Sequence, residues 1–169
     1  MSKAFTRESD DVPERTFMPR PTAVLPPGTK NYLTTDGARR LQEELDRLVQ
    51  ERPRVAAAPD GGDAKQRLQV IDRRVLHLEQ SLRSAVIVPT PPTPWDQVRF
   101  GATITVRNHT GEESRYRIVG VDETDIDLGW VSWLSPIAKA LLNARLGQRV
   151  RFKLPSGEEE LELVSISYE

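Results

Sequence analysis

The chain has 169 residues, a formal net charge of -1 and 29% charged residues, so it has room for one domain or two small ones. Because the charges nearly balance, no strong overall field is present to attract nucleic acid or a membrane surface. The chain contains no cysteine, which excludes disulfide bonds, thiolate chemistry and cysteine-based metal sites. No apolar run approaches the ~18 residues of a membrane span and no signal peptide is visible, so we expect a cytoplasmic protein without a membrane partner.

The first thirty residues have the composition of a tail. Their charges are mixed, and they contain few large apolar side chains. The prolines of this stretch are Pro13, Pro19, Pro21, Pro26 and Pro27. This composition is typical of disordered or polyproline-like chain, so we predict a disordered tail over residues 1–30.

A helical hairpin is predicted over residues 31–87. Apolar residues of its second arm step by 3, 4, 3 and 4, which is the spacing of a coiled-coil seam. These residues are Leu68, Ile71, Val75, Leu78 and Leu82. The first arm has Leu41, Leu45 and Leu48, with Arg52 and Val55 on the same rows. Pro59 and two glycines interrupt the helix between the arms, so the two apolar stripes turn to face each other.

The ends of the two arms carry recognisable signals. Residues 34–36 offer side-chain oxygens that can cap the first arm, and Pro53 is expected to kink that arm or end its regular part. Asp63 is predicted to cap the second arm, with Gln66 completing a capping box. His77, within the second arm, is predicted to be a solvated or flanking helix residue rather than a metal ligand.

The second half of the chain differs from the first in composition and in its predicted secondary structure. A proline-rich linker is predicted over residues 88–96, followed by a domain over residues 97–169. Strands are predicted at 102–106, 116–121, 130–133, 149–154 and 160–167. One short helix is predicted from 137 to about 144, with Ser135 as its cap and Pro136 at its first position. We therefore expect an α+β chain whose second domain is an antiparallel sheet with one short helix.

Several motifs in a fixed order resemble the GreA/GreB family of bacterial transcript-cleavage factors, over roughly residues 30–169. They are Leu33–Gly37 before the leucine-rich arm, Ile71–Val75, Tyr116–Gly120, Ser135–Leu141, and Leu154–Glu158 together with Tyr168. The Ile71–Val75 motif, and Glu51–Pro53 in the first arm, are closer to GreB than to GreA. Each motif alone is weak, and the ordered set is specific.

The resemblance implies a fold and a function. The fold is an N-terminal antiparallel coiled coil and a C-terminal FKBP-like domain without isomerase activity. The second domain would dock on bacterial RNA polymerase at the rim of the secondary channel, while the coiled coil enters the channel towards the nascent RNA 3′ end. Acidic residues at the tip then help to hold a Mg²⁺ shared with the polymerase, so that backtracked RNA is hydrolysed. The factor itself is not an enzyme, because it only lends carboxylates.

The resemblance places the tip acids at Asp60 and Asp63, which would be both the catalytic and the metal-binding residues. Family members carry an Asp and a Glu at this spacing, followed by an aromatic residue that is missing here. The hairpin is also shorter by about one heptad per arm, or roughly 10 Å of reach. A local explanation is equally available, in which Pro59–Gly61 forms a turn and Asp63 only caps a helix. Both interpretations stay open.

Two further sites follow from the resemblance. Basic residues on the distal arms would contact RNA, namely Arg52, Arg54, Lys65, Arg67, Arg73 and Arg74. Glu51 and Asp72 lie among them, so an ordinary ion-paired, solvated face is the alternative.

Polymerase docking is expected at the start of the short helix, on Leu134, Ser135, Pro136, Ile137 and Lys139. Leu134 stands where GreB-like sequences have an Asp. The alternative is a capped helix that simply packs on the sheet. Trp130 and Trp133 flank the segment and would belong to an interface if exposed or to the core if buried.

Three functions remain open at this point. The chain is a cleavage factor, a non-catalytic occupant of the channel that inhibits or competes with such factors, or a folding helper with an FKBP-like domain. The first two need RNA polymerase as partner. We expect a monomer.

Overall fold

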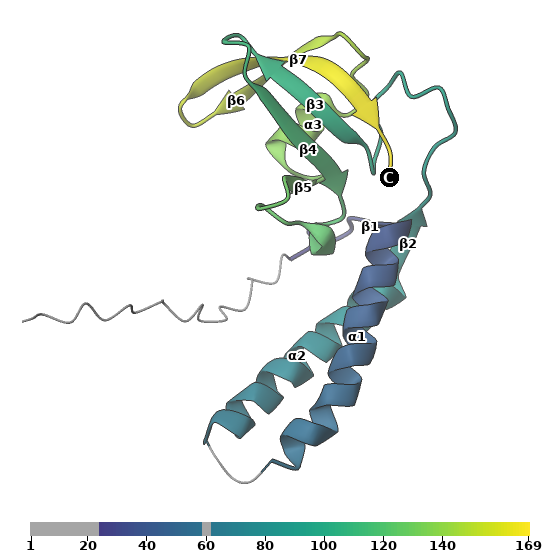
Figure 1. Ribbon diagram of the computed structural model, residues 1–169, viewed down its shortest axis with the longest axis vertical. Coiled ribbons are helices and arrows are strands. Elements are labelled where there is room, and N and C mark those ends of the chain that lie inside the picture. Colours follow the sequence, from purple (N-terminus) through teal and green to yellow (C-terminus); the bar gives the residue numbers. More distant parts are fainter. Residues whose placement is uncertain (1–23, 59–61) are drawn as a thin grey trace, which may run out of the picture.

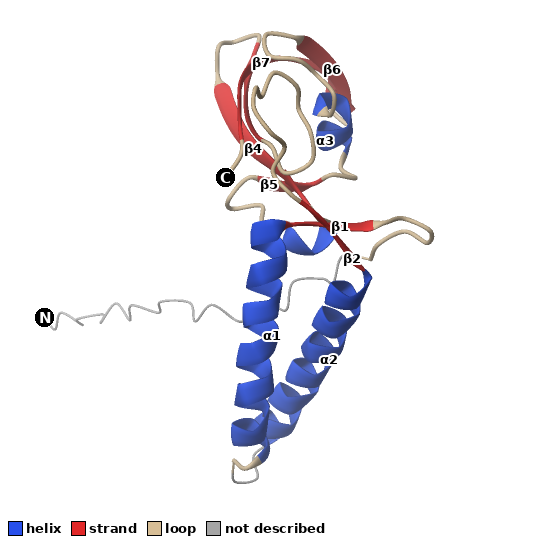
Figure 2. Cartoon of the chain, turned by 90° about the vertical axis from the view of Figure 1, so that its right-hand side faces the viewer, coloured by secondary structure: helices blue, strands red, loops and turns tan. Residues whose placement is uncertain are grey.

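The computed structural model describes residues 24–58 and 62–169, which form a long helical hairpin and a curled sheet domain (Figure 1). The hairpin projects away from the sheet domain, and the two meet only at the base of the hairpin (Figures 1 and 2). Most of the predicted tail, residues 1–23, lies outside the described residues, and so does Asp60. In the described part of the chain, no helix is long and apolar enough to cross a membrane.

The hairpin consists of α1 (Thr35–Ala56) and α2 (Gly62–Ser84), which run side by side in opposite directions (Figure 2). Its seam confirms the predicted periodicity. Leu41, Leu48, Ile71 and Leu78 are buried, and Leu45, Val55, Val75 and Leu82 pack against them.

The helix ends differ in part from the prediction. Thr34 caps α1, because its Oγ1 accepts a hydrogen bond from the Gly37 N–H at 2.9 Å. Pro53 does not end α1: the Ala57 N–H donates to the Pro53 carbonyl at 3.0 Å and closes one more turn. The cap prediction for Asp63 is wrong, since α2 already begins at Gly62 and places Asp63 inside its first turn.

A two-stranded parallel sheet crosses the base of the hairpin, formed by β1 (Asn31–Thr34) and β2 (Ala85–Val88). Asn31 lies opposite Ala85 and Thr34 opposite Val88. These strands were not predicted. They are too short to show an alternating pattern of their own, and each exists only because the hairpin returns the chain to its partner.

The C-terminal domain is a five-stranded sheet in the order β5-β4-β3-β7-β6. Its strands are β3 (Thr103–Asn108), β4 (Glu113–Val119), β5 (Trp130–Ser132), β6 (Arg149–Leu154) and β7 (Gly157–Ser167). The predicted strands are confirmed, but the sheet is mixed rather than antiparallel, because β5 pairs in parallel with β4. The 3-10 turn η1 (Val121–Glu123) and a loop carry the chain from the end of β4 back to the start of β5, which makes the two strands parallel.

The core of this domain lies between the sheet and α3 (Pro136–Leu141). Ala138 and Leu141 on α3 are fully buried, together with Ile104, Ile118 and Leu163 on the sheet. The predicted cap is confirmed: Ser135 Oγ accepts from the Ala138 N–H at 3.2 Å, and Pro136 occupies the first helical position. The helix ends at Leu141, sooner than the predicted 144.

Candidate functional site

The hairpin tip presents Asp63 to solvent in the first turn of α2. A carboxylate there is favoured by the unpaired N–H groups of a helix start, so its position has a local reason. Asp60, the other predicted tip acid, lies outside the described residues. Within residues 24–58 and 62–169, no group of three or more His, Cys, Asp or Glu side chains is arranged to hold a metal ion.

Half of the six predicted RNA-contacting residues form ion pairs within the hairpin. Arg52 Nε lies 2.6 Å from Asp72 Oδ1, and Arg67 Nη2 lies 3.3 Å from Glu51 Oε1. Arg74 forms a bidentate ion pair with Glu44, in which the Nε–Oε1 distance is 2.8 Å and the Nη2–Oε2 distance is 2.7 Å. These ion pairs raise the pKa values of Arg52 and Arg74, mainly through the hydrogen bonds that the two guanidinium groups donate to Asp72 and Glu44.

The remaining predicted RNA contacts are Arg54, Lys65 and Arg73. Each is exposed, and no ion pair joins any of them to another described residue. The structure thus divides the basic residues into two groups, one tied to acids on the opposite arm and one facing solvent. This division was invisible in the sequence, where both groups alternate with acids.

The predicted docking segment lies where β5 leads into α3. Pro136 and Lys139 are exposed, while Leu134, Ser135 and Ile137 are half-buried. The Leu134 N–H donates to Ser132 Oγ at 3.1 Å, which fixes the chain just before the cap. Ile137 packs against the domain core, so it serves the fold as well as any interface.

The base of the hairpin contains a buried carboxylate that sequence analysis did not single out. Glu123, on η1, is only 6% exposed. It accepts hydrogen bonds from the Thr34 N–H at 2.9 Å, the Thr34 hydroxyl at 2.5 Å and the Gly120 N–H at 2.9 Å. Burying a carboxylate is costly unless donors surround it, and here three donors and the start of α1 do so. Glu123 thereby ties the cap of α1 to the C-terminal domain.

Its neighbour Asp122 holds the other helix. Asp122 Oδ1 lies 2.8 Å from His77 Nε2, and its Oδ2 accepts a hydrogen bond from the Ser81 hydroxyl. Asn31 Nδ2 donates to the Ser81 carbonyl at 3.0 Å, which adds β1 to the same network. His77, predicted to be a solvated or flanking residue, is therefore half-buried at the junction of the two units.

Aromatic rings cover the same junction. The Tyr32 ring lies 5.0 Å from that of Trp133 and 5.8 Å from that of Phe100. The centre of the Trp130 ring lies 4.1 Å from the guanidinium carbon of Arg40 and 5.0 Å from that of Arg117. Trp130 and Trp133, for which both an interface and a core position were open, are thus half-buried and contact residues of the hairpin base.

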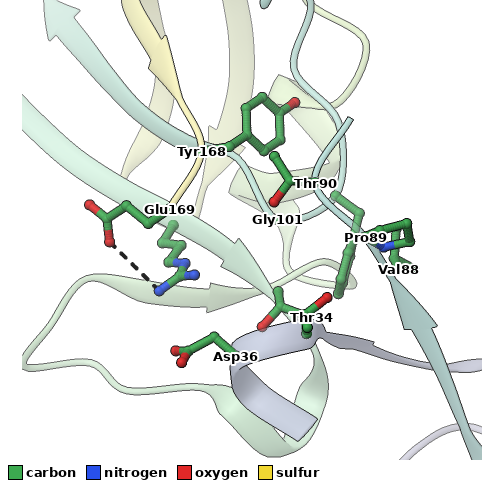
Figure 3. Close-up of a pocket in the computed structure, with 11 residues that line it drawn as sticks. Thr34, Asp36, Val88, Pro89, Thr90, Gly101, Tyr168 and Glu169 are labelled. Carbon is green, nitrogen blue, oxygen red and sulfur yellow. Dashed lines mark ion pairs between the residues drawn. The ribbon is translucent and has the colours of Figure 1, made fainter. Parts of the chain in front are cut away.

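A small pocket opens beside this junction, between the start of α1 and the end of the chain (Figure 3). Buried Arg117 forms an ion pair of 3.8 Å with Glu169, the pair marked by the dashed line in Figure 3. The hydrogen bond from Arg39 lowers the pKa of Asp36, and the charges of Arg40 and Arg117 add to this effect against the opposing influence of burial. The pocket thus marks the seam between the two units.

Sequence reasoning missed this junction because residues 122–129 only connect the strands predicted at 116–121 and 130–133. The available signal was the pair of acids directly after the strand predicted at 116–121. Two acids after a strand are equally typical of an exposed turn. Only the return of the hairpin brings Thr34 to Glu123 and His77 to Asp122.

A helical hairpin mounted on a small curled sheet defines the class of protein, and comparison with known proteins identifies the family. The family described as "Transcription elongation factor, GreA/GreB, C-term" matches residues 92–168. Transcription elongation factor GreB of Neisseria meningitidis serogroup B is 41% identical over 155 residues, covering 83% of this chain and 95% of that protein. Transcription elongation factor GreA of Trichlorobacter lovleyi is 40% identical over 152 residues, covering 81% and 96%.

A solved structure of a GreA/GreB factor from Nitrosomonas europaea is 24% identical, with coverage of 82% of this chain and 100% of that chain and a TM-score of 0.42. This chain matches nearly the whole length of both GreB and GreA relatives. The chain belongs to the GreA/GreB family of transcription elongation factors.

Proposed function

We propose that this protein binds bacterial RNA polymerase at its secondary channel and modulates the elongation of backtracked complexes. Membership of the GreA/GreB family is the observation that carries this proposal. The shape supports it, because the hairpin projects clear of the sheet domain and its tip is free to enter a channel (Figure 1). The docking surface is the start of α3, where Pro136 and Lys139 are exposed and Leu134 is half-exposed beside them.

In this proposal the factor stimulates transcript cleavage without being an enzyme. Asp60 and Asp63 lend carboxylates to a Mg²⁺ that the polymerase holds. A hard cation of this kind takes oxygen ligands and keeps several waters, and a second metal can activate the attacking water and stabilise the leaving oxygen.

The nascent RNA near its 3′ end is the second proposed partner. Arg54, Lys65 and Arg73 are the cations best placed for it, because they are exposed and unpaired among the described residues. Arg52, Arg67 and Arg74 would first have to leave their acids. Phosphate contacts of this kind position the RNA without reading its sequence.

A second candidate function is a non-catalytic occupant of the channel that inhibits or competes with cleavage factors at initiation or pausing. One observation favours it. Asp63 lies within the first turn of α2, where the helix start alone accounts for it, and its side chain is one methylene shorter than the Glu of cleavage-active relatives. The shorter hairpin points in the same direction.

The deciding experiment uses a backtracked elongation complex of the cognate polymerase with 3′-labelled RNA. The parent protein and an Asp60→Ala/Asp63→Ala double variant are added at a series of Mg²⁺ concentrations. Glu79→Ala, which removes an exposed acid of α2, is the matched control. Release of short 3′ fragments by the parent and the control, but not by the double variant, is the result expected for a cleavage factor.

The other outcomes separate the alternatives. No release, combined with competition against a known cleavage factor, assigns the protein as a channel occupant. No release and no competition would contradict the polymerase proposal itself.

A further inference from the structure

We propose that Asp122 and Glu123 are positioning residues that fix the direction of the hairpin relative to the C-terminal domain. This inference rests on the proposed function, since it concerns where the tip lies once that domain is docked on polymerase. The two residues are adjacent on η1, yet they bind different helices. Glu123 holds Thr34 at the start of α1, and Asp122 holds His77 and Ser81 near the end of α2.

The contacts of Glu123 with α1 and of Asp122 with α2 together restrain the hairpin more than either contact alone. A single contact leaves the hairpin free to rotate about that contact, whereas two contacts on separate helices remove the rotation. The chain itself supplies little restraint, because it passes from the hairpin to the domain once, through residues 89–102 between β2 and β3. The packing of Tyr32 on Trp133 brings the two units together, but apolar contacts tolerate sliding that hydrogen bonds of fixed length do not.

The Glu123 side chain fits tightly between two glycines, Gly37 and Gly120. A Cβ added at Gly37 would lie 1.8 Å from Glu123 Oε1, and one added at Gly120 would lie 2.2 Å from the Tyr32 carbonyl oxygen. The backbones of β1 and of the residue after β4 therefore lie in close contact, and the start of α1 packs directly on the Glu123 side chain. This closeness is needed for the Thr34 N–H and hydroxyl to reach one carboxylate together.

The direction of the hairpin matters because the hairpin is a lever. The 22 residues of α1 make a rod of about 33 Å. A change of roughly 10° at the base therefore moves the tip by about 6 Å over such a length. A carboxylate must come within ~2.1 Å of Mg²⁺ to be a ligand, so small errors at η1 exceed the tolerance at the tip.

The direction can be measured on the free protein. The chain has no native cysteine, so cysteines placed at exposed Arg47 and His109 can be spin-labelled without interference. The distance distribution between the labels is compared for the parent, for Glu123→Gln, for Asp122→Asn and for the double variant. Asp127→Asn, an exposed acid on the same loop, is the matched control.

We expect one narrow distance for the parent and the control, and a broadened or shifted distribution for the double variant. An unchanged distribution in the double variant overturns the proposal. If the η1 variants fail to fold, the same measurement is made with Thr34→Val, which removes the hydroxyl that reaches Glu123, and with Thr34→Ser, which keeps it. Broadening in the valine variant and its absence in the serine variant support the proposal, and equal distributions contradict it.

The consequence for function is measured on polymerase. The half-saturating concentration should stay unchanged, because the docking surface is intact. The maximal effect at saturation, whether cleavage or inhibition, should fall by about tenfold or more, as expected when a reacting group is misplaced. Loss of affinity without loss of maximal effect would contradict a positioning role.

Failure of the proposed function is distinguishable from failure of this inference. In that case the parent protein has no effect on polymerase at all, while the label distances still report whether η1 fixes the hairpin.

Discussion

The base and the distal half of the hairpin differ in how deeply their polar groups are buried and in how these groups are paired. At the base, Asn31, Thr34, Ser81 and Glu123 are each at least nine-tenths buried and hydrogen-bonded. In the distal half, the polar contacts are ion pairs between side chains that stay in water, with Arg52 and its partner about half exposed.

This difference shows which part of the hairpin determines how the hairpin and the C-terminal domain are arranged. A buried polar network is stable only in the one geometry that satisfies all its members. Exposed ion pairs contribute little and can exchange partners. The base therefore determines the arrangement of the two units, and the distal half is left free to interact with something else.

The largest expected effect comes from the apolar seam at the base. Leu78→Ala should lower the free energy of unfolding by about 2–5 kcal/mol, because Leu78 is fully buried and its removal leaves a cavity. Leu76, on the same helix but 55% exposed, is the control, and its replacement by Ala should stay within about 0.5 kcal/mol. Urea unfolding followed by circular dichroism measures both, and similar losses in the two variants would refute this view of the seam.

A smaller effect is expected from the contact between α1 and η1. Gly37→Ala places a methyl group against Glu123, so the carboxylate must leave Thr34. The lost hydrogen bonds should lower stability by about 1–3 kcal/mol. Gly62→Ala is the control, since its Cβ meets nothing within 4 Å and the change should stabilise by up to about 1 kcal/mol. Thermal unfolding compares them, and a neutral Gly37→Ala variant would mean that the junction is loose.

The smallest effect is expected for the exposed ion pair between the arms. A double-mutant cycle with Arg52→Ala and Asp72→Ala should give a coupling energy of about 0.2–1 kcal/mol. The coupling should weaken as salt is raised, because salt screens exposed charges. Arg54→Ala, in place of Arg52→Ala, should show no coupling to Asp72. A coupling larger than the Gly37→Ala effect would reverse the contrast between the two halves.

Much of the fold could be predicted because its signals are local. The steps of three and four from Ile71 to Leu82 fix the seam, and Ser135 with Pro136 marks the start of α3. The parallel pair β1–β2 and the parallel edge strand β5 could not be predicted in this way. They have four and three residues, and their pairing depends on partners brought from elsewhere in the chain.

The same difference between local and long-range signals explains why only part of the candidate site could be predicted from the sequence. Residues such as Ser135 and Asp63 could be named because the resemblance gives them positions in short motifs. Glu123 and His77 could not, since nothing in a local window separates a buried, paired side chain from an exposed one. Their roles come from contacts across 89 and 45 residues of sequence.

That separation also sets an order of events during synthesis. The two arms of the hairpin lie next to each other in the sequence, so they can pair as soon as Ser84 has left the ribosome. The carboxylate that completes the α1 cap network belongs to Glu123, 89 residues after Thr34, and long-range contacts of this kind form late. A nascent chain released before residue 123 therefore carries a hairpin whose α1 cap lacks its hydrogen bonds to Glu123.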